Sequence, residues 1–277
     1  MRRGTATGVG GFPEATRLKA SMVTPHASSA GLPGIPRLRS FAGIHRLPLL
    51  SAQEAAFWTS EVLQERQAWT RRGSGCFFSL GAAAYMDVLS PDQYAQYLRK
   101  ARTSNRVLAG RFRPLLVAVA KCLKQVLCPT PVGFGEPWGL PGFHIWETSA
   151  IPSKNGASRH YDLQFRSLDH SHYQEVDTER PWTFTMLLRL PAAGALLHVW
   201  DLPRGDTRLR PSIDFEARDR RLQTTERYDH HYVAGEVLFH DGLLLHQIGA
   251  VPVVPGDLRV ALQGHALLCD GVWRLYW

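Results

Sequence analysis

Hydrophobic positions change their spacing about halfway along the chain. Over residues 41–130 they recur at the three- and four-residue intervals of amphipathic helices, so this part is predicted to be helical. Ser51 and Glu54 have the spacing of a capping box and are predicted to start the first helix. A Ser-Pro-Asp sequence at 90–92 starts the second, and a third, longer helix is predicted over residues 108–127.

After residue 142 the pattern becomes that of strands, because short runs rich in Thr, Val, Phe and Leu alternate with Gly, Pro and Asp turns. The predicted strands cover residues 143–148, 159–165, 182–190, 195–200, 232–239, 243–248 and 258–268. The highly charged residues 204–227 are interpreted as a long loop, with a lid over the substrate as the less favoured alternative. Many short strands after a helical half predict an α+β fold, with a β-sandwich or jelly roll braced by N-terminal helices.

Charge is distributed unevenly along the chain, and this distribution decides whether a nucleic-acid partner is predicted. The net charge is +8, but residues 1–40 hold six Lys or Arg and one acidic residue, whereas the other 237 residues hold 26 basic and 23 acidic side chains. Residues 1–40 also lack periodicity, so they are predicted to be a flexible basic tail, with a targeting segment as the alternative. The balanced charge of the remaining chain predicts no nucleic-acid partner.

Composition and cysteine spacing restrict the compartment. The longest uncharged apolar stretch, near residues 114–120, is too short to span a bilayer, so no membrane association is predicted. The four cysteines show no C-x-x-C spacing and are predicted to be reduced thiols in a cytoplasmic protein. The sequence contains no feature that predicts the oligomeric state.

One tripeptide, His160-Tyr161-Asp162, is the only His-x-Asp in the chain. On the predicted strand, residues two apart project from the same face, so the imidazole and the carboxylate would lie side by side as ligands of one metal ion. His246, in an apolar run, offers a second imidazole. Two imidazoles and one carboxylate leave adjacent positions on the metal open, which suits non-haem Fe(II). Each residue alone would more often be a surface pair or a core histidine.

A candidate anion site follows thirteen residues after His246. Arg259 is predicted to face the interior of a barrel together with Ala261, Gln263 and His265. A buried guanidinium needs an anion, and a carboxylate fits its fork of donors. Gln263 and His265 are interpreted either as cavity groups or as hydrogen-bonding groups of the core.

The order His160-x-Asp162, His246, Arg259 resembles that of the Fe(II)/2-oxoglutarate-dependent dioxygenases, and the run 235–259, in which a Val-Pro and a Gly follow the second His, is similar to their prolyl-hydroxylase-like branch. The resemblance implies that His160, Asp162 and His246 bind iron and that Arg259 binds the far carboxylate of 2-oxoglutarate. It further implies consumption of O₂, release of succinate and CO₂, oxidation of a substrate C–H bond, and ascorbate as an optional reductant.

The same resemblance refines the fold prediction. It implies a double-stranded β-helix (jelly-roll) core over residues 142–268, with the helices of residues 41–130 as its support. Residues 41–277 would then form a single oxygenase domain after the tail 1–40.

Three positions, two that differ from patterns in the family and one that matches, narrow the chemistry that the resemblance implies. The family often has Ser or Thr two residues after the Arg; here Ala261 stands there, so either a Tyr or Thr on a neighbouring strand helps to bind the carboxylate or 2-oxoglutarate binds more weakly. Nucleic-acid demethylases carry a second Arg where this chain has His265. Halogenating members lack the carboxylate that Asp162 provides, so hydroxylation, or a related oxidation such as desaturation, is favoured.

The sequence does not select the substrate. A free amino acid, a peptide-bound residue and a small metabolite are all compatible with it, because specificity depends on loops and on the mouth of the cavity. The alternative from another functional class is a β-helix protein that has lost turnover and acts as a binding module; the complete set of ligands and Arg259 argue against it.

Overall fold

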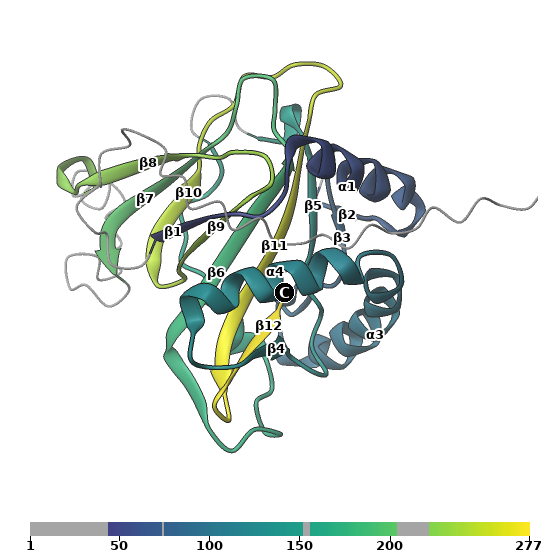
Figure 1. Ribbon diagram of the computed structural model, residues 1–277, viewed down its shortest axis with the longest axis vertical. Coiled ribbons are helices and arrows are strands. Elements are labelled where there is room, and N and C mark those ends of the chain that lie inside the picture. The colour runs from purple at the N-terminus through teal and green to yellow at the C-terminus, as the bar shows by residue number, and fades with distance from the viewer. Residues whose placement is uncertain (1–43, 74, 152–155, 204–221) are drawn as a thin grey trace, which may run out of the picture. The chain divides into compact units, whose positions relative to one another are not determined.

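Two mainly antiparallel sheets and a layer of helices make up the part of the chain that the computed structural model describes, residues 44–73, 75–151, 156–203 and 222–277 (Figure 1). The helices are α1 (Ala52–Gln64), α2 (Ala84–Asp87), α3 (Tyr94–Arg111) and α4 (Arg113–Leu127). The strands are β1 (Ile44–Pro48), β2 (Thr70–Arg72), β3 (Phe77–Leu80), β4 (Val132–Phe134), β5 (Gly142–Glu147), β6 (Val176–Arg189), β7 (Leu196–Pro203), β8 (Arg227–His231), β9 (Glu236–Asp241), β10 (Leu244–Ile248), β11 (Leu258–Cys269) and β12 (Val272–Tyr276).

The described residues belong to one compact unit, Ser40–Trp277. The predicted tail at 1–40 and most of the predicted loop at 204–227 lie outside the described residues. The domain boundaries expected from the sequence therefore remain predictions.

The larger sheet has the strand order β1-β9-β6-β11-β5-β3-β2. Its long central strand β11 pairs with β6 along one side, and with β5 and then β12 along the other. The smaller sheet has the order β10-β7-β8. Several neighbouring strands, such as β1 and β9, β6 and β11, and β5 and β11, are distant in sequence, as a jelly roll requires.

Alternate residues of β11 show how the layers pack. Val260 and Leu262 belong to the hydrophobic cluster that includes residues of α1, α3 and α4, whereas Ala261 packs with residues of the smaller sheet. The helices thus cover one face of the larger sheet and the smaller sheet covers the other, with α4 crossing in front of β6 and β11 in Figure 1. The predicted α+β class with a jelly-roll core and supporting helices is confirmed.

The helix predictions are partly confirmed. Ser51 caps α1, and its hydroxyl accepts from the Glu54 N–H while Glu54 accepts from the Ser51 N–H, as the capping box requires. The third helix begins at Arg113 rather than at residue 108, because the chain leaves helical geometry at Phe112 and Pro114 occupies the first turn of a new helix.

Residues 41–130 are not wholly helical, which corrects the sequence prediction. They also contribute β1, β2 and β3, which extend the larger sheet at its two ends. These strands have three to five residues each. Strands this short carry no clear alternation, so only their pairing with β9 and β5 reveals them.

The predicted strand at 232–239 is also corrected, since β8 ends at His231 and β9 begins at Glu236. Gly235 makes the turn between them with a φ of 80°, a conformation that favours glycine. A Cβ at this position would lie 2.3 Å from the carbonyl oxygen of Leu50. The turn leaves Tyr232 just past the end of β8, pointing between the sheets.

Candidate metal centre

The His-x-Asp tripeptide does not lie on a continuous strand, contrary to prediction. Only His160 makes a β-bridge, with His246 of β10, and a short 3₁₀ turn begins at Gln164. The backbones of His160 and His246 exchange two N–H···O hydrogen bonds of 3.0 Å, and the Asp162 N–H donates to the Gly242 carbonyl at 2.8 Å. These bonds keep the segment extended alongside β10, so His160 and Asp162 still project to the same side.

Three side chains converge at this bridge. One ligand atom from each of His160, Asp162 and His246 lies within 4.8 Å of the others. The Asp162 carboxylate is 3.7 Å from Nε2 of His160 and 3.3 Å from Nε2 of His246. Ligands at right angles and roughly 2.1 Å from a first-row metal would be about 3 Å apart, so the arrangement is close to one face of an octahedron.

Backbone carbonyls hold both imidazoles with Nε2 turned toward the Asp162 carboxylate. Nδ1 of His160 lies 2.9 Å from the Ser158 carbonyl oxygen, and Nδ1 of His246 lies 2.9 Å from the Leu244 carbonyl oxygen. A carbonyl can only accept, so each Nδ1 carries a proton, and each imidazole in its neutral form would offer the lone pair of Nε2 to a metal. Such outer partners fix the tautomer and the ring orientation of metal-bound histidines. The donor set therefore fits a divalent transition metal.

Charge and exposure agree with this interpretation. Burial by itself would raise the pKa of Asp162, but the imidazoles of His246, His265 and His160 hold that pKa well below its usual range, so the carboxylate is ionised. The side chains of Asp162 and His246 are buried, whereas the His160 side chain is 42% exposed. The His160 side is therefore the more exposed side of the centre.

Arg259 lies on the same face of β11 as Ala261, as predicted, and this face packs toward the smaller sheet. It is buried, 1% exposed, and its Nε has no hydrogen-bond partner in the described part of the chain. Burial lowers the pKa of Arg259, and the neighbouring Tyr232 opposes that shift. A buried cation with an unused donor is costly unless an anion completes its environment.

Tyr232 supplies a contact that the sequence did not specify. The guanidinium carbon of Arg259 lies 5.5 Å from the centre of the Tyr232 ring, and its N–H groups and the Thr185 hydroxyl interact with the phenol oxygen. Thr185 is on β6 and Tyr232 follows β8, so the two residues come from different sheets. Their location matches the expected Tyr or Thr on a neighbouring strand, near the position that Ala261 leaves without a hydroxyl.

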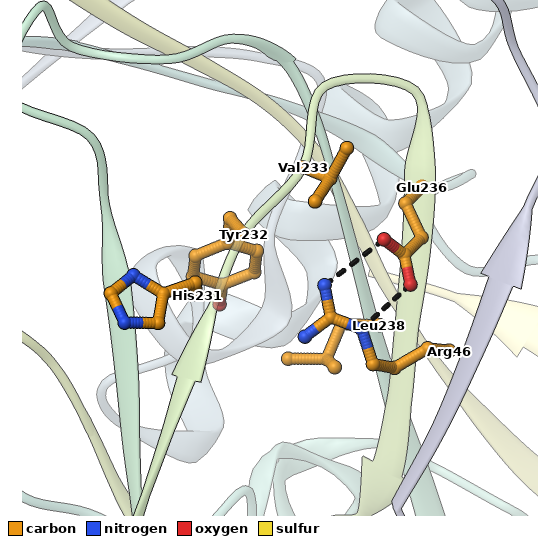
Figure 2. Close-up of a pocket in the computed structure, with 6 residues that line it drawn as sticks. All are labelled: Arg46, His231, Tyr232, Val233, Glu236 and Leu238. Atoms are coloured by element: carbon orange, nitrogen blue, oxygen red, sulfur yellow. Dashed lines mark hydrogen bonds and ion pairs between the residues drawn. The ribbon is translucent and has the colours of Figure 1, made fainter. Parts of the chain in front are cut away.

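Tyr232 also lines a small recess on the side where β8, β9 and β1 meet (Figure 2). In this recess Arg46 and Glu236 form a two-pronged ion pair with N–O distances of 2.7 and 3.0 Å. The empty space is about 140 Å³ including open solvent. This is below the roughly 300–1,000 Å³ typical of ligand pockets, so the recess is not the substrate cavity.

Other polar groups surround the centre, and sequence reasoning assigned them weakly or not at all. His240, which the sequence placed in a turn, bonds the Asp241 carbonyl through Nδ1 and packs 4.8 Å from the His246 ring. The Tyr85 hydroxyl lies 2.6 Å from Nε2 of His144, which is buried.

Comparisons with known proteins bear on the fold. No protein-family model matches the chain, and no curated protein matches it by sequence. Among solved structures, an N-substituted L-amino acid dioxygenase from Burkholderia ambifaria AMMD matches with a TM-score of 0.51 and 12% identity, covering 84% of this chain and 86% of that one. The α-ketoglutarate-dependent epimerase SnoN from nogalamycin biosynthesis matches with a TM-score of 0.47 and 16% identity over 84% and 81%, and a Pseudomonas putida prolyl-4-hydroxylase with 0.36 and 12% over 85% and 93%.

The first of these likenesses shows the fold of the chain, which is that of this N-substituted L-amino acid dioxygenase. Within that fold the chain has an intact His-x-Asp…His cluster formed by His160, Asp162 and His246. The resemblance seen in the sequence is therefore confirmed for the architecture and for the presence of the triad. None of the helices in the described part combines the length and apolar character needed to cross a membrane.

Proposed function

We propose that the protein is an Fe(II)- and 2-oxoglutarate-dependent oxygenase that hydroxylates a C–H bond of an amino acid, a peptide or a small metabolite. The proposal is carried by one observation: two imidazole Nε2 atoms and an ionised carboxylate meet at one point, with both imidazole tautomers set by backbone carbonyls. The balanced reaction converts 2-oxoglutarate, O₂ and R–H into succinate, CO₂ and R–OH. Bound Fe(II) would supply the activation of O₂.

The roles of the protein groups follow from their positions. His160, Asp162 and His246 would occupy one face of the metal, so the opposite face stays available for the 2-oxo acid and O₂. Arg259 would bind the far carboxylate of 2-oxoglutarate with its unused Nε–H. The exposed side of His160 gives the substrate its approach.

Tyr232 would complete the cosubstrate site. Its oxygen already interacts with donors from Arg259 and Thr185, so its own O–H can donate to the same carboxylate. This contact takes the place of the hydroxyl that is often found where the chain has Ala261. The burial of Arg259 strengthens both interactions, since the local dielectric is low.

The direct test is succinate formation by the full-length protein with Fe(II), 2-oxoglutarate, O₂ and ascorbate as reductant. We expect slow uncoupled turnover without substrate and faster turnover with members of a panel of amino acids, peptides and small metabolites. The competing function is an inactive binding module of the same fold. No succinate across the panel, from protein that binds Fe(II) and 2-oxoglutarate, would favour that alternative.

Tyr232→Phe is expected to raise the KM for 2-oxoglutarate by roughly 10-fold, because a hydrogen bond to a charged group contributes about 1.5–3 kcal/mol. The turnover number at saturating 2-oxoglutarate should change much less. Initial rates over a range of 2-oxoglutarate concentrations measure both constants. Tyr228→Phe, on β8 four residues before Tyr232, is the matched control and should leave the KM unchanged. An unchanged KM in Tyr232→Phe would place the contact elsewhere.

A cytoplasmic location is proposed on the cysteines alone. Cys76, Cys122, Cys128 and Cys269 are all unpaired thiols. This state is typical of proteins in reducing compartments.

A further inference from the structure

Behind the Asp162 carboxylate lies a buried chain of hydrogen bonds that the proposed reaction does not use. The Thr183 hydroxyl is 2.6 Å from Oδ2 of Asp162, and on its other side it is 3.0 Å from Nδ1 of His265. The side-chain amide nitrogen of Gln164 contacts the edge of the His265 ring that carries both Nδ1 and Nε2. All four side chains are at most 7% exposed, so water cannot substitute for these partners.

The direction of both Thr183 bonds follows from counting protons. An ionised carboxylate only accepts, so the single hydroxyl proton of Thr183 points at Asp162. The Thr183 oxygen must then accept from His265, which places a ring proton on Nδ1.

The backbone holds the chain of bonds in place at both ends. Thr183 and His265 are directly opposed residues of β6 and β11 in the larger sheet. Gln164 follows Asp162 by two residues, at the start of the 3₁₀ turn that ends the extended segment. The bonds thus tie the metal-ligand segment, which is joined to the smaller sheet by one bridge, to the centre of the larger sheet.

We propose that Thr183, directed by His265, is the positioning residue of the metal centre: its hydroxyl fixes the rotation of the Asp162 carboxylate and so sets the metal affinity. The inference rests on the proposed function, because it takes Asp162 as a metal ligand. With one lone pair of Oδ2 committed to Thr183, the carboxylate cannot turn freely to bind the metal through both oxygens. One-point binding keeps three metal positions available.

The test compares the metal affinities of two variants. Their order distinguishes a positioning role of the Thr183 hydroxyl from a packing role of the side chain. Thr183→Val keeps the shape of the side chain and removes the donor, whereas Thr183→Ser keeps the donor and removes a methyl group. We expect Thr183→Val to weaken Mn(II) binding by about 10- to 100-fold, the usual effect of losing an outer partner of a metal ligand. Thr183→Ser should stay within about 3-fold of the wild type, since its hydroxyl still reaches Oδ2. A packing role predicts the reverse order, with Val tolerated better than Ser.

The measurement is anaerobic Mn(II) titration of the full-length protein, with thermal melting of the metal-free protein as the check on folding. Thr59→Val makes the same change at a buried threonine whose hydroxyl bonds only its own helix, and should leave the affinity unchanged. If Thr183→Val does not fold, Thr183→Ala applies the same test. Folded Thr183→Val with wild-type affinity, or Thr183→Ser as weak as Val, overturns the inference. A wild type that binds no Mn(II) instead refutes the proposed function.

Discussion

Asp162→Ala is expected to lower succinate formation by more than about 100-fold, because losing even an outer partner of a metal ligand costs 10- to 100-fold. Affinity for Mn(II) should fall with it, since the substitution removes the only carboxylate of the triad. The fold should survive. Removing a buried charge leaves no unpaired anion behind, and the backbone bonds of the segment to Gly242 and His246 do not involve the side chain.

Succinate release, Mn(II) titration and thermal melting of the same preparations measure these effects. Asp229→Ala is the matched control, because Asp229 forms a comparable pair with His198, 2.6 Å apart, on the smaller sheet. The control should keep the activity of the wild type. An Asp162→Ala protein that turns over at the wild-type rate without added halide would show that the carboxylate is not a ligand.

Arg259→Ala should raise the KM for 2-oxoglutarate by about 30-fold or more, since truncating one partner of a buried charge pair costs at least about 2 kcal/mol. Turnover at saturating cosubstrate should be affected far less, because Arg259 would bind the end of 2-oxoglutarate remote from the metal. The KM of Arg259→Lys should lie between those of the wild type and Arg259→Ala, because lysine keeps the charge but lacks the planar fork of donors. The metal-free protein should be no less stable, since the substitution removes a buried cation.

Initial rates at graded 2-oxoglutarate concentrations separate KM from turnover. Arg189→Ala provides the control, because this arginine is on the neighbouring strand β6 but its side chain is 41% exposed. A KM that stays at the wild-type value in Arg259→Ala would mean that another cation binds the carboxylate.

The elements that could be predicted from the sequence are those with local determinants. The α1 helix begins where its capping box places it, and β11 keeps the alternation that directs Arg259 between the sheets. The strands β1–β3 were missed because their stability comes from pairing with β9 and β5 rather than from their own three to five residues. The break at Phe112 between α3 and α4 shows the same limit, since Pro114 can lie inside a predicted helix or begin one.

The residues of the candidate site also divide into those with a local sequence signal and those without one. His160, Asp162, His246 and Arg259 could be chosen because their spacing along the chain is itself informative. Tyr232 could not, since it reaches Arg259 and Thr185 only after the two sheets close on each other. Thr183 has no distinguishing sequence context either. Its role depends on the register between β6 and β11, which places it opposite His265.

A single β-bridge, between His160 and His246, aligns the metal-ligand segment with β10. The geometry of the centre therefore depends on the register between this segment and β10. Successive residues of an extended chain face opposite ways. A shift of the segment by one position against β10 would therefore turn Tyr161 toward the centre and turn His160 and Asp162 away from it. Gly242 and His246 anchor the two ends of this alignment through backbone bonds. One residue inserted between His160 and Asp162, which lie outside the strands of both sheets, would therefore keep every ligand in the chain, leave both sheets paired, and still dismantle the metal centre.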